Sequence, residues 1–202
     1  DRSSQKFYNK YPLVEGKQFA LFLSRIHPKK GIDLLIQAYG RLRSLPDNFD
    51  LVIAGPDHDS LREKLMTYCP PELKGRIHWV GMLSGDIKWG AYQAAECFIL
   101  PSHQENFGIV VAEALSTSTP VLITNKVNIW REIDNGNAGF VEKDNVEGIE
   151  GLLANWLKLS EENKNEMREN AKLCYQKNFS MESAVESLEK TLIQLLGNRK
   201  SS

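Results

Sequence analysis

Short apolar runs alternate with longer amphipathic segments along most of this chain. Runs rich in Val, Ile, Leu and Phe predict strands, and segments with apolar residues at helical spacing predict the helices between them. From about residue 146 the pattern is helical, with breaks at Ser160 and Ser180, two residues suited to cap a helix. The predicted strands are 19–24, 49–55, 77–81, 97–101, 120–124 and 138–142, and the predicted helices between them are 32–45, 59–69, 85–96 and 108–118.

The predicted strands are mainly apolar rather than alternating in polarity. Such strands belong to a parallel sheet whose two faces are both covered by helices. We therefore expect an α/β fold, a doubly wound parallel sheet of the Rossmann type, over residues 18–202. Residues 1–17 are polar and aperiodic, which predicts a linker or tail, and the first residue is Asp1 rather than Met. We expect the chain to be a piece of a longer protein.

The composition argues against several classes of partner. The 202 residues are 42% hydrophobic and 25% charged, and 25 Lys and Arg against 26 Asp and Glu leave a net charge of -1. This balance does not favour binding to nucleic acid or to an anionic surface. The sequence has no signal peptide pattern and no apolar run near the ~18 residues of a membrane helix. Three scattered cysteines without a CxxC spacing fit a reducing, cytoplasmic setting: Cys69, Cys97 and Cys174.

Basic residues follow the first predicted strand. In "SRIHPKKGID", Arg25, Lys29, Lys30 and Gly31 lie in a turn that leads directly into a helix. Ligands of doubly wound sheets bind at the carboxyl ends of the strands, and the N-terminus of a helix attracts anions. The turn therefore suits a phosphate or diphosphate, and the alternative is a solvated basic turn.

Glycines follow the second and third predicted strands. Gly55 in "AGPDHDS" allows a ligand to approach the backbone, and Asp57 or Asp59 is placed to cap the next helix. Gly81 in "VGMLS" leaves room for a planar base beside the backbone. Each glycine has an equally good explanation as part of a tight turn.

Two acids follow the fourth predicted strand, in "PSHQENFGIVVAEA". Glu105 comes just before a predicted helix and Glu113 lies inside it. An ionised carboxylate only accepts hydrogen bonds, so this pair suits the hydroxyl groups of a sugar and a ribose. The alternatives are a helix N-terminal acid for Glu105 and a salt-bridged helix residue for Glu113. Together with the basic turn, the pair indicates a polyhydroxylated ligand that carries phosphate.

These motifs resemble those of a known family. "PSHQENFGIVVAEALSTSTPV" resembles the E-x7-E motif of retaining glycosyltransferases of family four, the group 1 type, and "FLSRIHPKKGIDLLIQAYGRL" resembles the same family's phosphate-binding turn. "LVIAGPD", "VGMLS" and "NGNAGFVEKDN" follow in the expected order. The resemblance covers the chain from about Phe19 to the C-terminal helices.

The resemblance implies the C-terminal, donor-binding half of a two-domain GT-B glycosyltransferase. Arg25 and Lys30 would hold the diphosphate of a nucleoside-diphosphate sugar and stabilise the leaving nucleotide. Glu105 would accept bonds from the transferred sugar near the reacting centre, and Glu113 would bind the ribose. The remaining implied donor-binding positions are Gly55, Gly81, Met82, Asn106, Phe107, Gly108 and Ile109.

The resemblance also implies how the whole protein works. The expected reaction retains the anomeric configuration and needs no cofactor or metal, in a pathway of glycan or polysaccharide synthesis. The acceptor would bind to an N-terminal domain missing from this chain, and the full protein would have at most peripheral contact with a membrane. We therefore expect the chain alone to bind donor without turnover. The donor, the acceptor and the oligomeric state stay open.

The sequence departs from the family pattern in places. Ser118 stands where Gly is usual, Met181 where Trp is frequent, and "TNKVNIWRE" lacks paired glycines, so that Asn128 would contact the donor through its side chain instead. His103 is interpreted as a loop residue rather than a catalytic base. The C-terminal helices would present an apolar face that includes Leu192, Ile193 and Leu196.

Three other functions remain as alternatives. A nucleotide-dependent oxidoreductase would need a GxGxxG at the first turn, where "SRIHPKKG" has bulky basic residues. A non-catalytic nucleotide-sugar-binding module would have the same fold. An epimerase of the same architecture would carry a different set of acid and base groups.

Overall fold

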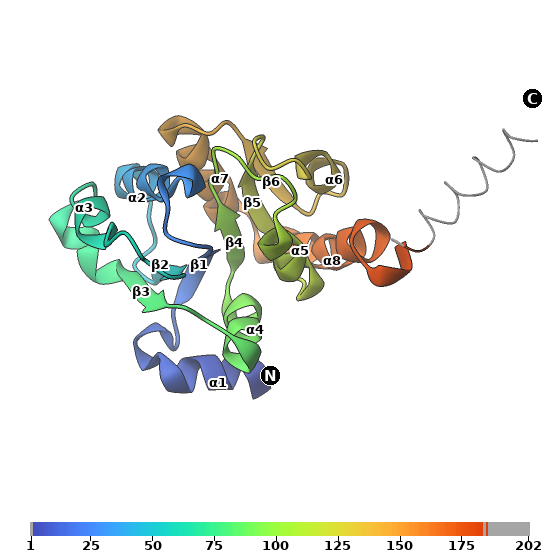
Figure 1. The fold of residues 1–202 in the computed structure, drawn as a ribbon, viewed down its shortest axis with the longest axis horizontal. Coiled ribbons are helices and arrows are strands. Elements are labelled where there is room, and N and C mark those ends of the chain that lie inside the picture. The colour runs from blue at the N-terminus through green and yellow to red at the C-terminus, as the bar shows by residue number, and fades with distance from the viewer. Residues whose placement is uncertain (1, 184, 186–202) are drawn as a thin grey trace, which may run out of the picture.

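The part of the chain that the structure describes forms one six-stranded sheet in which every strand pair is parallel (Figure 1). The structure, a computed structural model, describes residues 2–183 and 185. The strand order is β3-β2-β1-β4-β5-β6, so the chain reverses its direction of travel across the sheet between β1 and β4. This confirms the predicted doubly wound sheet. The strands are β1 (Gln18–Leu23), β2 (Phe49–Ala54), β3 (Ile77–Gly81), β4 (Cys97–Leu100), β5 (Val121–Thr124) and β6 (Gly139–Glu142).

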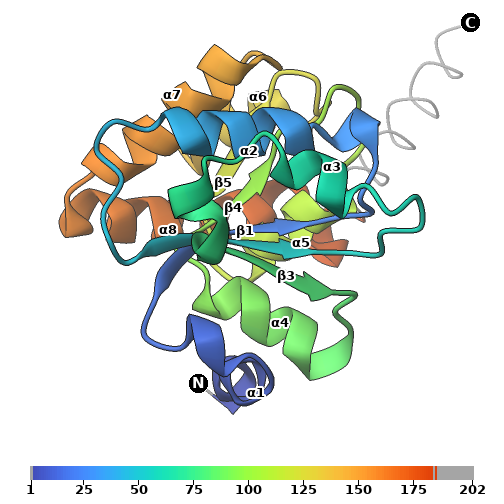
Figure 2. The ribbon, with the colours of Figure 1, turned by 90° about the vertical axis from the view of Figure 1, so that its left-hand side faces the viewer.

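Helices cover both faces of the sheet. Figure 2 shows α2, α3 and α7 above it and α1 and α4 below it. Helix α7 returns to pack on α2, and α8 contacts both α5 and α6. The helices are α1 (Arg2–Lys10), α2 (Ile32–Arg41), α3 (Arg62–Met66), α4 (Gly85–Ala94), α5 (Ile109–Ser116), α6 (Trp130–Asn135), α7 (Val146–Lys158) and α8 (Glu161–Asn178), with short 3-10 turns η1 (Pro12–Val14), η2 (Pro28–Lys30) and η3 (Pro71–Arg76).

The core lies along the central strands. Every residue of β2, β4 and β5 is buried, which explains why these runs show no polar alternation. The three cysteines are free and buried, and Cys97 opens β4 as a small core residue. None of the helices in the described part of the chain combines the length and the apolar composition that a membrane crossing needs.

The first residues differ from the sequence expectation. Residues 2–10 form helix α1 rather than a linker or tail, and α1 packs against α4. Phe7 of α1 is completely buried, and Gly90 of α4 allows the close approach, because a Cβ there would collide with the Ser3 carbonyl. The segment is polar on average and Phe7 is its one buried side chain, so the sequence interpretation took it for a tail.

Several helix ends also differ from the sequence expectation. Helix α3 is shorter than 59–69, because the Asp57 carboxylate accepts the N–H groups of Leu61 and Arg62 and so sets a later start. Helix α6 was not predicted. Ser160 caps α8 as expected, by accepting the N–H of Asn163.

Two further features singled out in the sequence are Ser118 and the apolar face of the C-terminal helices. Ser118, at the end of α5, has a φ of 61°, a left-handed conformation that favours the glycine the resemblance expects there. The apolar face with Leu192, Ile193 and Leu196 lies outside the described residues.

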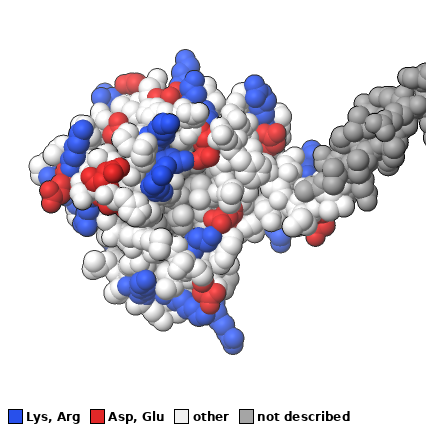
Figure 3. Space-filling view, viewed as in Figure 1, with Lys and Arg blue, Asp and Glu red and all other residues white. Residues whose placement is uncertain are grey.

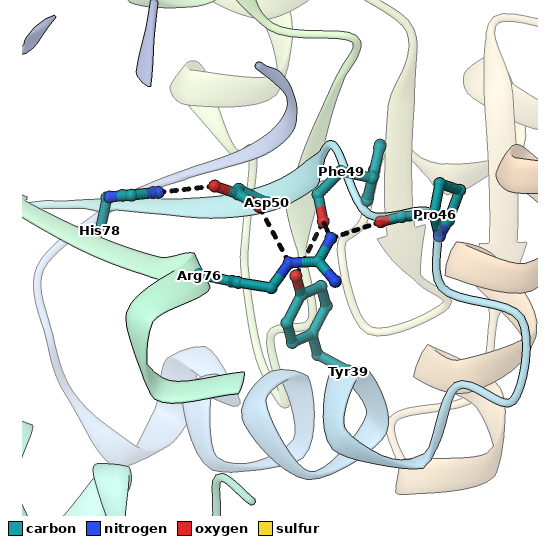
Figure 4. Close-up of polar contacts among 6 residues, drawn as sticks. All are labelled: Tyr39, Pro46, Phe49, Asp50, Arg76 and His78. Atoms are coloured by element: carbon teal, nitrogen blue, oxygen red, sulfur yellow. Dashed lines mark hydrogen bonds and ion pairs between the residues drawn. The ribbon is translucent and has the colours of Figure 1, made fainter. Parts of the chain in front are cut away.

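A buried polar cluster ties the amino end of the sheet together (Figure 4). Asp50 of β2 is 2% exposed. Its carboxylate lies 3.1 Å from Nε of Arg76 and 2.8 Å from Nε2 of His78. Arg76 also donates to the carbonyls of Pro46 and Phe49. Burial alone would raise the pKa of Asp50, but the hydrogen bonds and charges of His78 and Arg76 outweigh it and lower that pKa. The cluster therefore holds an ionised carboxylate in the core, far from the carboxyl ends of the strands.

Candidate functional site

The candidate site lies where the direction of the chain reverses, at the carboxyl ends of β1 and β4. These strands are neighbours in the sheet. Strand β1 leads into α2 on one face, whereas β4 leads into α5 on the other. The two connecting turns therefore lead to opposite faces of the sheet, and this is the position at which doubly wound sheets bind ligands.

The turns after β1 and β4 are joined by backbone contacts. The Lys29 carbonyl accepts the hydroxyl of Ser102 at 3.0 Å and the N–H of His103 at 2.9 Å. Gly31 has a φ of 67°, and a Cβ at this position would collide with the carbonyl oxygen of Pro101. These contacts require glycine at 31 and fix the position of one turn relative to the other.

This junction places Lys30 against Glu105. The Lys30 ammonium pairs with Oε2 of Glu105, and the two side chains are 17% and 20% exposed. The structure therefore brings together two residues that the sequence placed in separate motifs. Arg25 and Lys29 are exposed on the same turn. In Figure 3, Lys and Arg side chains gather on this face over the turn between β1 and α2.

The backbone of Glu105 is held by the loop that follows β5. Its N–H donates to the Lys126 carbonyl and its carbonyl accepts the N–H of Asn128, both at 3.0 Å. Asn128 thus contributes through its backbone, and its side chain is exposed. Glu105 is therefore anchored at both its main chain and its carboxylate.

The N-terminus of α5 lies at the same edge of the sheet, just after β4. Gly108 precedes the helix with a φ of 71°, and its carbonyl accepts the N–H of Val111 at 2.7 Å. The first amides of a helix have no acceptor within it, and in the described part of the chain those of Ile109 and Val110 donate to no other backbone group. Asn106 is exposed, and Phe107 and Ile109 are 48% and 67% exposed. The arrangement leaves hydrogen-bond donors and apolar contact surface available to a ligand.

Glu113 points toward α4 instead of toward Lys30. Its Oε1 lies 2.7 Å from the Lys88 ammonium and its Oε2 accepts the Tyr92 hydroxyl at 3.0 Å. Burial, reinforced by the negative charge of Glu113, raises the pKa of Tyr92, so this hydroxyl stays protonated and donates. The salt-bridged alternative for Glu113 is therefore present in the structure. Sequence reasoning missed Lys88 and Tyr92, although their spacing of four residues places them on one face of a predicted helix.

The glycines at the ends of β2 and β3 differ in their surroundings. Gly55 has a φ of 146°, its N–H donates to the Gly81 carbonyl at 2.8 Å, and a Cβ would collide with the Ser24 carbonyl. Gly55 thus serves the packing of neighbouring turns. A Cβ at Gly81 would meet no atom within 4 Å, and Met82 is 70% exposed. Gly81 therefore has free space on the side that a Cβ would occupy, whereas Gly55 does not.

His103, another polar residue of this face, is paired with an acid. His103 Nδ1 lies 3.0 Å from Oδ2 of Asp144, in the loop before α7. Burial opposes ionisation of Asp144, but this bond and nearby positive charges outweigh it and lower its pKa. Within residues 2–183 and 185, no three His, Cys, Asp or Glu side chains are placed together to hold a metal ion.

The family of the chain follows from comparison with known proteins. Residues 3–173 match the family model described as glycosyl transferases group 1. The chain is 30% identical over 150 residues to a phosphatidyl-myo-inositol mannosyltransferase of Mycolicibacterium smegmatis, covering 70% of this chain and 38% of that protein. It is 30% identical over 135 residues to a lipopolysaccharide 1,2-N-acetylglucosaminetransferase of Salmonella typhimurium, covering 63% of this chain and 35% of that protein. The chain belongs to the group 1 glycosyl transferases.

Solved structures show the same fold. A glycosyltransferase from Rickettsia africae superposes with a TM-score of 0.81 at 21% identity, covering 98% of this chain and 52% of that one. The complex of Anabaena Alr3699/HepE with UDP and glucose superposes with a TM-score of 0.77 at 17% identity, covering 96% and 52%. These neighbours have the two-domain GT-B architecture, and the match is consistent with a C-terminal half. The chain spans about half the length of these structures and under two fifths of the two relatives above.

Proposed function

We propose that this chain is the donor-binding half of a retaining glycosyltransferase, which transfers a sugar from a nucleoside-diphosphate sugar to an acceptor bound by another domain. The observation that carries the proposal is the meeting of Lys30 and Glu105 at the switch point of the sheet, beside the exposed Arg25 and the N-terminus of α5. A cationic group next to an acceptor-only group matches a molecule with phosphate at one end and hydroxyls at the other. The UDP complexes of Anabaena HepE support a nucleotide ligand.

The proposed chemistry assigns a role to each group. Arg25 and Lys30 bind the diphosphate, and Lys30 uses its further N–H donors to keep contact with Glu105. Glu105 accepts bonds from hydroxyls of the transferred sugar. As the bond from the anomeric carbon to the diphosphate oxygen breaks, that oxygen takes the electron pair, and Arg25 and Lys30 stabilise its negative charge. The acceptor hydroxyl forms the new bond from the same face and gives its proton to the departing diphosphate.

The proposal predicts binding without turnover for the chain alone. Transfer requires donor and acceptor to be held together with water excluded, and the acceptor belongs to the other domain. Calorimetry with UDP-, GDP- and ADP-sugars should show saturable binding of at least one donor. Release of nucleotide from the same sample should stay at the rate measured without protein.

Each result of this pair of assays has a clear meaning. Turnover at the pace of ordinary enzymes, roughly 1 per second or more, would place the acceptor site within this chain and contradict the division of roles. Failure of every donor, nucleoside diphosphate and nucleotide to bind would contradict the donor-binding function itself.

The two acids are predicted to act on different parts of the donor. Glu113→Gln should weaken a free nucleotide and its sugar conjugate to the same extent, because both contain the ribose. Glu105→Gln should leave the free nucleotide unchanged and weaken the sugar conjugate by about tenfold, the effect of losing a hydrogen bond to a charged group. Dissociation constants of both ligands for both variants test this.

Glu132→Gln provides a matched control for these substitutions, because Glu132 lies in α6 and has no assigned contact with the donor. It should leave both dissociation constants unchanged. Equal effects of the Glu105 and Glu113 variants on both ligands would show that the two roles are wrongly divided.

A further inference from the structure

Lys88 and Tyr92 hold the carboxylate of Glu113 from one side. Lys88 is 2.7 Å from Oε1 and Tyr92 donates to Oε2 at 3.0 Å. Both come from α4, one helical turn apart, whereas Glu113 comes from α5. The two contacts use different oxygens, so they fix the plane of the carboxylate as well as its position.

The supporting residues are themselves held in place. Tyr92 is completely buried, and its ring lies 5.6 Å from the ring of Phe98. The Lys88 ammonium lies 4.6 Å from the centre of the Trp89 ring, a cation–π distance, and the lysine side chain is only 22% exposed. Because packing already fixes these two donors, little conformational entropy is lost when they position the Glu113 carboxylate.

The pairing leaves free acceptor capacity on Glu113. An ionised carboxylate has about four lone-pair sites, two on each oxygen. Lys88 occupies one site on Oε1 and Tyr92 one on Oε2. One site then remains on each oxygen, in a side chain that is 20% exposed. Two adjacent acceptor oxygens held in a fixed plane match the two vicinal hydroxyls of a ribose.

We propose that Lys88 and Tyr92 are positioning residues that keep the Glu113 carboxylate oriented toward both ribose hydroxyls, so that the preference for ribonucleotides over 2′-deoxyribonucleotides depends on them. The inference rests on the proposed donor-binding function. It adds that the selectivity for ribose over 2′-deoxyribose depends on α4, a helix outside the E-x7-E motif. Lys88 has its effect through Glu113 and not through the phosphates.

The test compares nucleotides that differ by one hydroxyl. Whichever of UDP, GDP and ADP binds most tightly is titrated calorimetrically beside its 2′-deoxy counterpart. The parent protein should prefer the ribonucleotide by about tenfold or more, the effect of a hydrogen bond to a charged acceptor. Tyr92→Phe and Lys88→Met should each reduce this ratio by about threefold or more, because each removes one donor that orients the carboxylate.

Matched variants separate positioning from stability. Tyr39→Phe removes another buried hydroxyl, which donates to the Phe49 carbonyl at 2.8 Å at the opposite end of the sheet. Lys164→Met removes another lysine that pairs with a glutamate, at 2.8 Å, and lies near a tryptophan, 5.6 Å from the ring of Trp156. Both should leave the ratio between the two nucleotides at the parental value, even where they lower the unfolding midpoint.

The outcomes distinguish this inference from the proposed donor-binding function on which it rests. If the parent binds nucleoside diphosphates but the Tyr92 and Lys88 variants keep the parental ratio, or weaken both nucleotides equally, the positioning role is overturned and the donor-binding function stands. If the parent binds the ribonucleotide and its 2′-deoxy counterpart equally well, Glu113 does not bind the ribose hydroxyls and the inference is overturned. A parent that binds no nucleotide overturns the proposed function and this inference with it.

Discussion

Replacing Arg25 and Lys30 together by alanine is expected to lower the affinity for a nucleoside diphosphate by about a hundredfold or more. Each side chain would supply a charge-assisted bond to phosphate, worth about 1.5–3 kcal/mol, and two such losses combine to roughly 10²–10⁴ in the dissociation constant. Binding of the bare nucleoside should be unchanged, since it has no phosphate. Titration of the nucleoside and its diphosphate into parent and double variant measures the difference.

Lys29→Ala is the control for this double variant. Lys29 lies on the same turn and its side chain is exposed, whereas its contribution to the junction with Ser102 and His103 comes from its backbone. Its replacement keeps the turn and removes one nearby charge, so only a small, salt-dependent loss is expected. If the Arg25 and Lys30 variant binds the diphosphate as tightly as the parent, the phosphate assignment is wrong.

Replacing Asp50 by alanine is expected to destabilise the fold by about 3 kcal/mol at neutral pH, the usual cost of removing one partner from a buried ion pair. The substitution leaves Arg76, whose side chain is 20% exposed, and His78, 14% exposed, without their shared acceptor. The free energy of unfolding from denaturant titration measures the effect. Asp86→Asn is the control, because Asp86 pairs with Lys6 in solvent and such pairs contribute little.

The pH dependence follows from the lowered pKa of Asp50. A carboxyl group whose pKa is lower in the folded state than in the unfolded state binds fewer protons when folded. Its contribution is complete above the unfolded pKa of about 4 and disappears as the pH falls through the lowered folded pKa. The difference in unfolding free energy between parent and Asp50→Asn should therefore shrink toward acidic pH. A difference that stays constant over that range would show that the charge of Asp50 does not stabilise the fold.

The sequence predicted most of the fold because its strongest signals are local. Strands buried on both faces are predominantly apolar, so β2, β4 and β5 stood out as runs without polar alternation, even though β2 contains Asp50. Caps are also local: Ser160 was predicted from its position before a helix, and Asp57 or Asp59 was predicted before another, of which the structure shows Asp57. Helix α1 escaped this reasoning because Phe7 alone is buried in a polar segment, and its partner α4 lies about 80 residues further along.

Pairing within the site required the tertiary structure. The sequence alone determined which residue types follow each strand: a basic turn after β1 and two acids around the start of α5. It did not determine that Lys30 meets Glu105, 75 residues away, or that Glu113 turns from that pair to Lys88 and Tyr92. Those contacts depend on the strand order, which makes β1 and β4 neighbours, and on the backbone bonds that join their turns. Residue pattern therefore specified the chemistry available at this edge of the sheet, and the packing of the strands decided which groups act together.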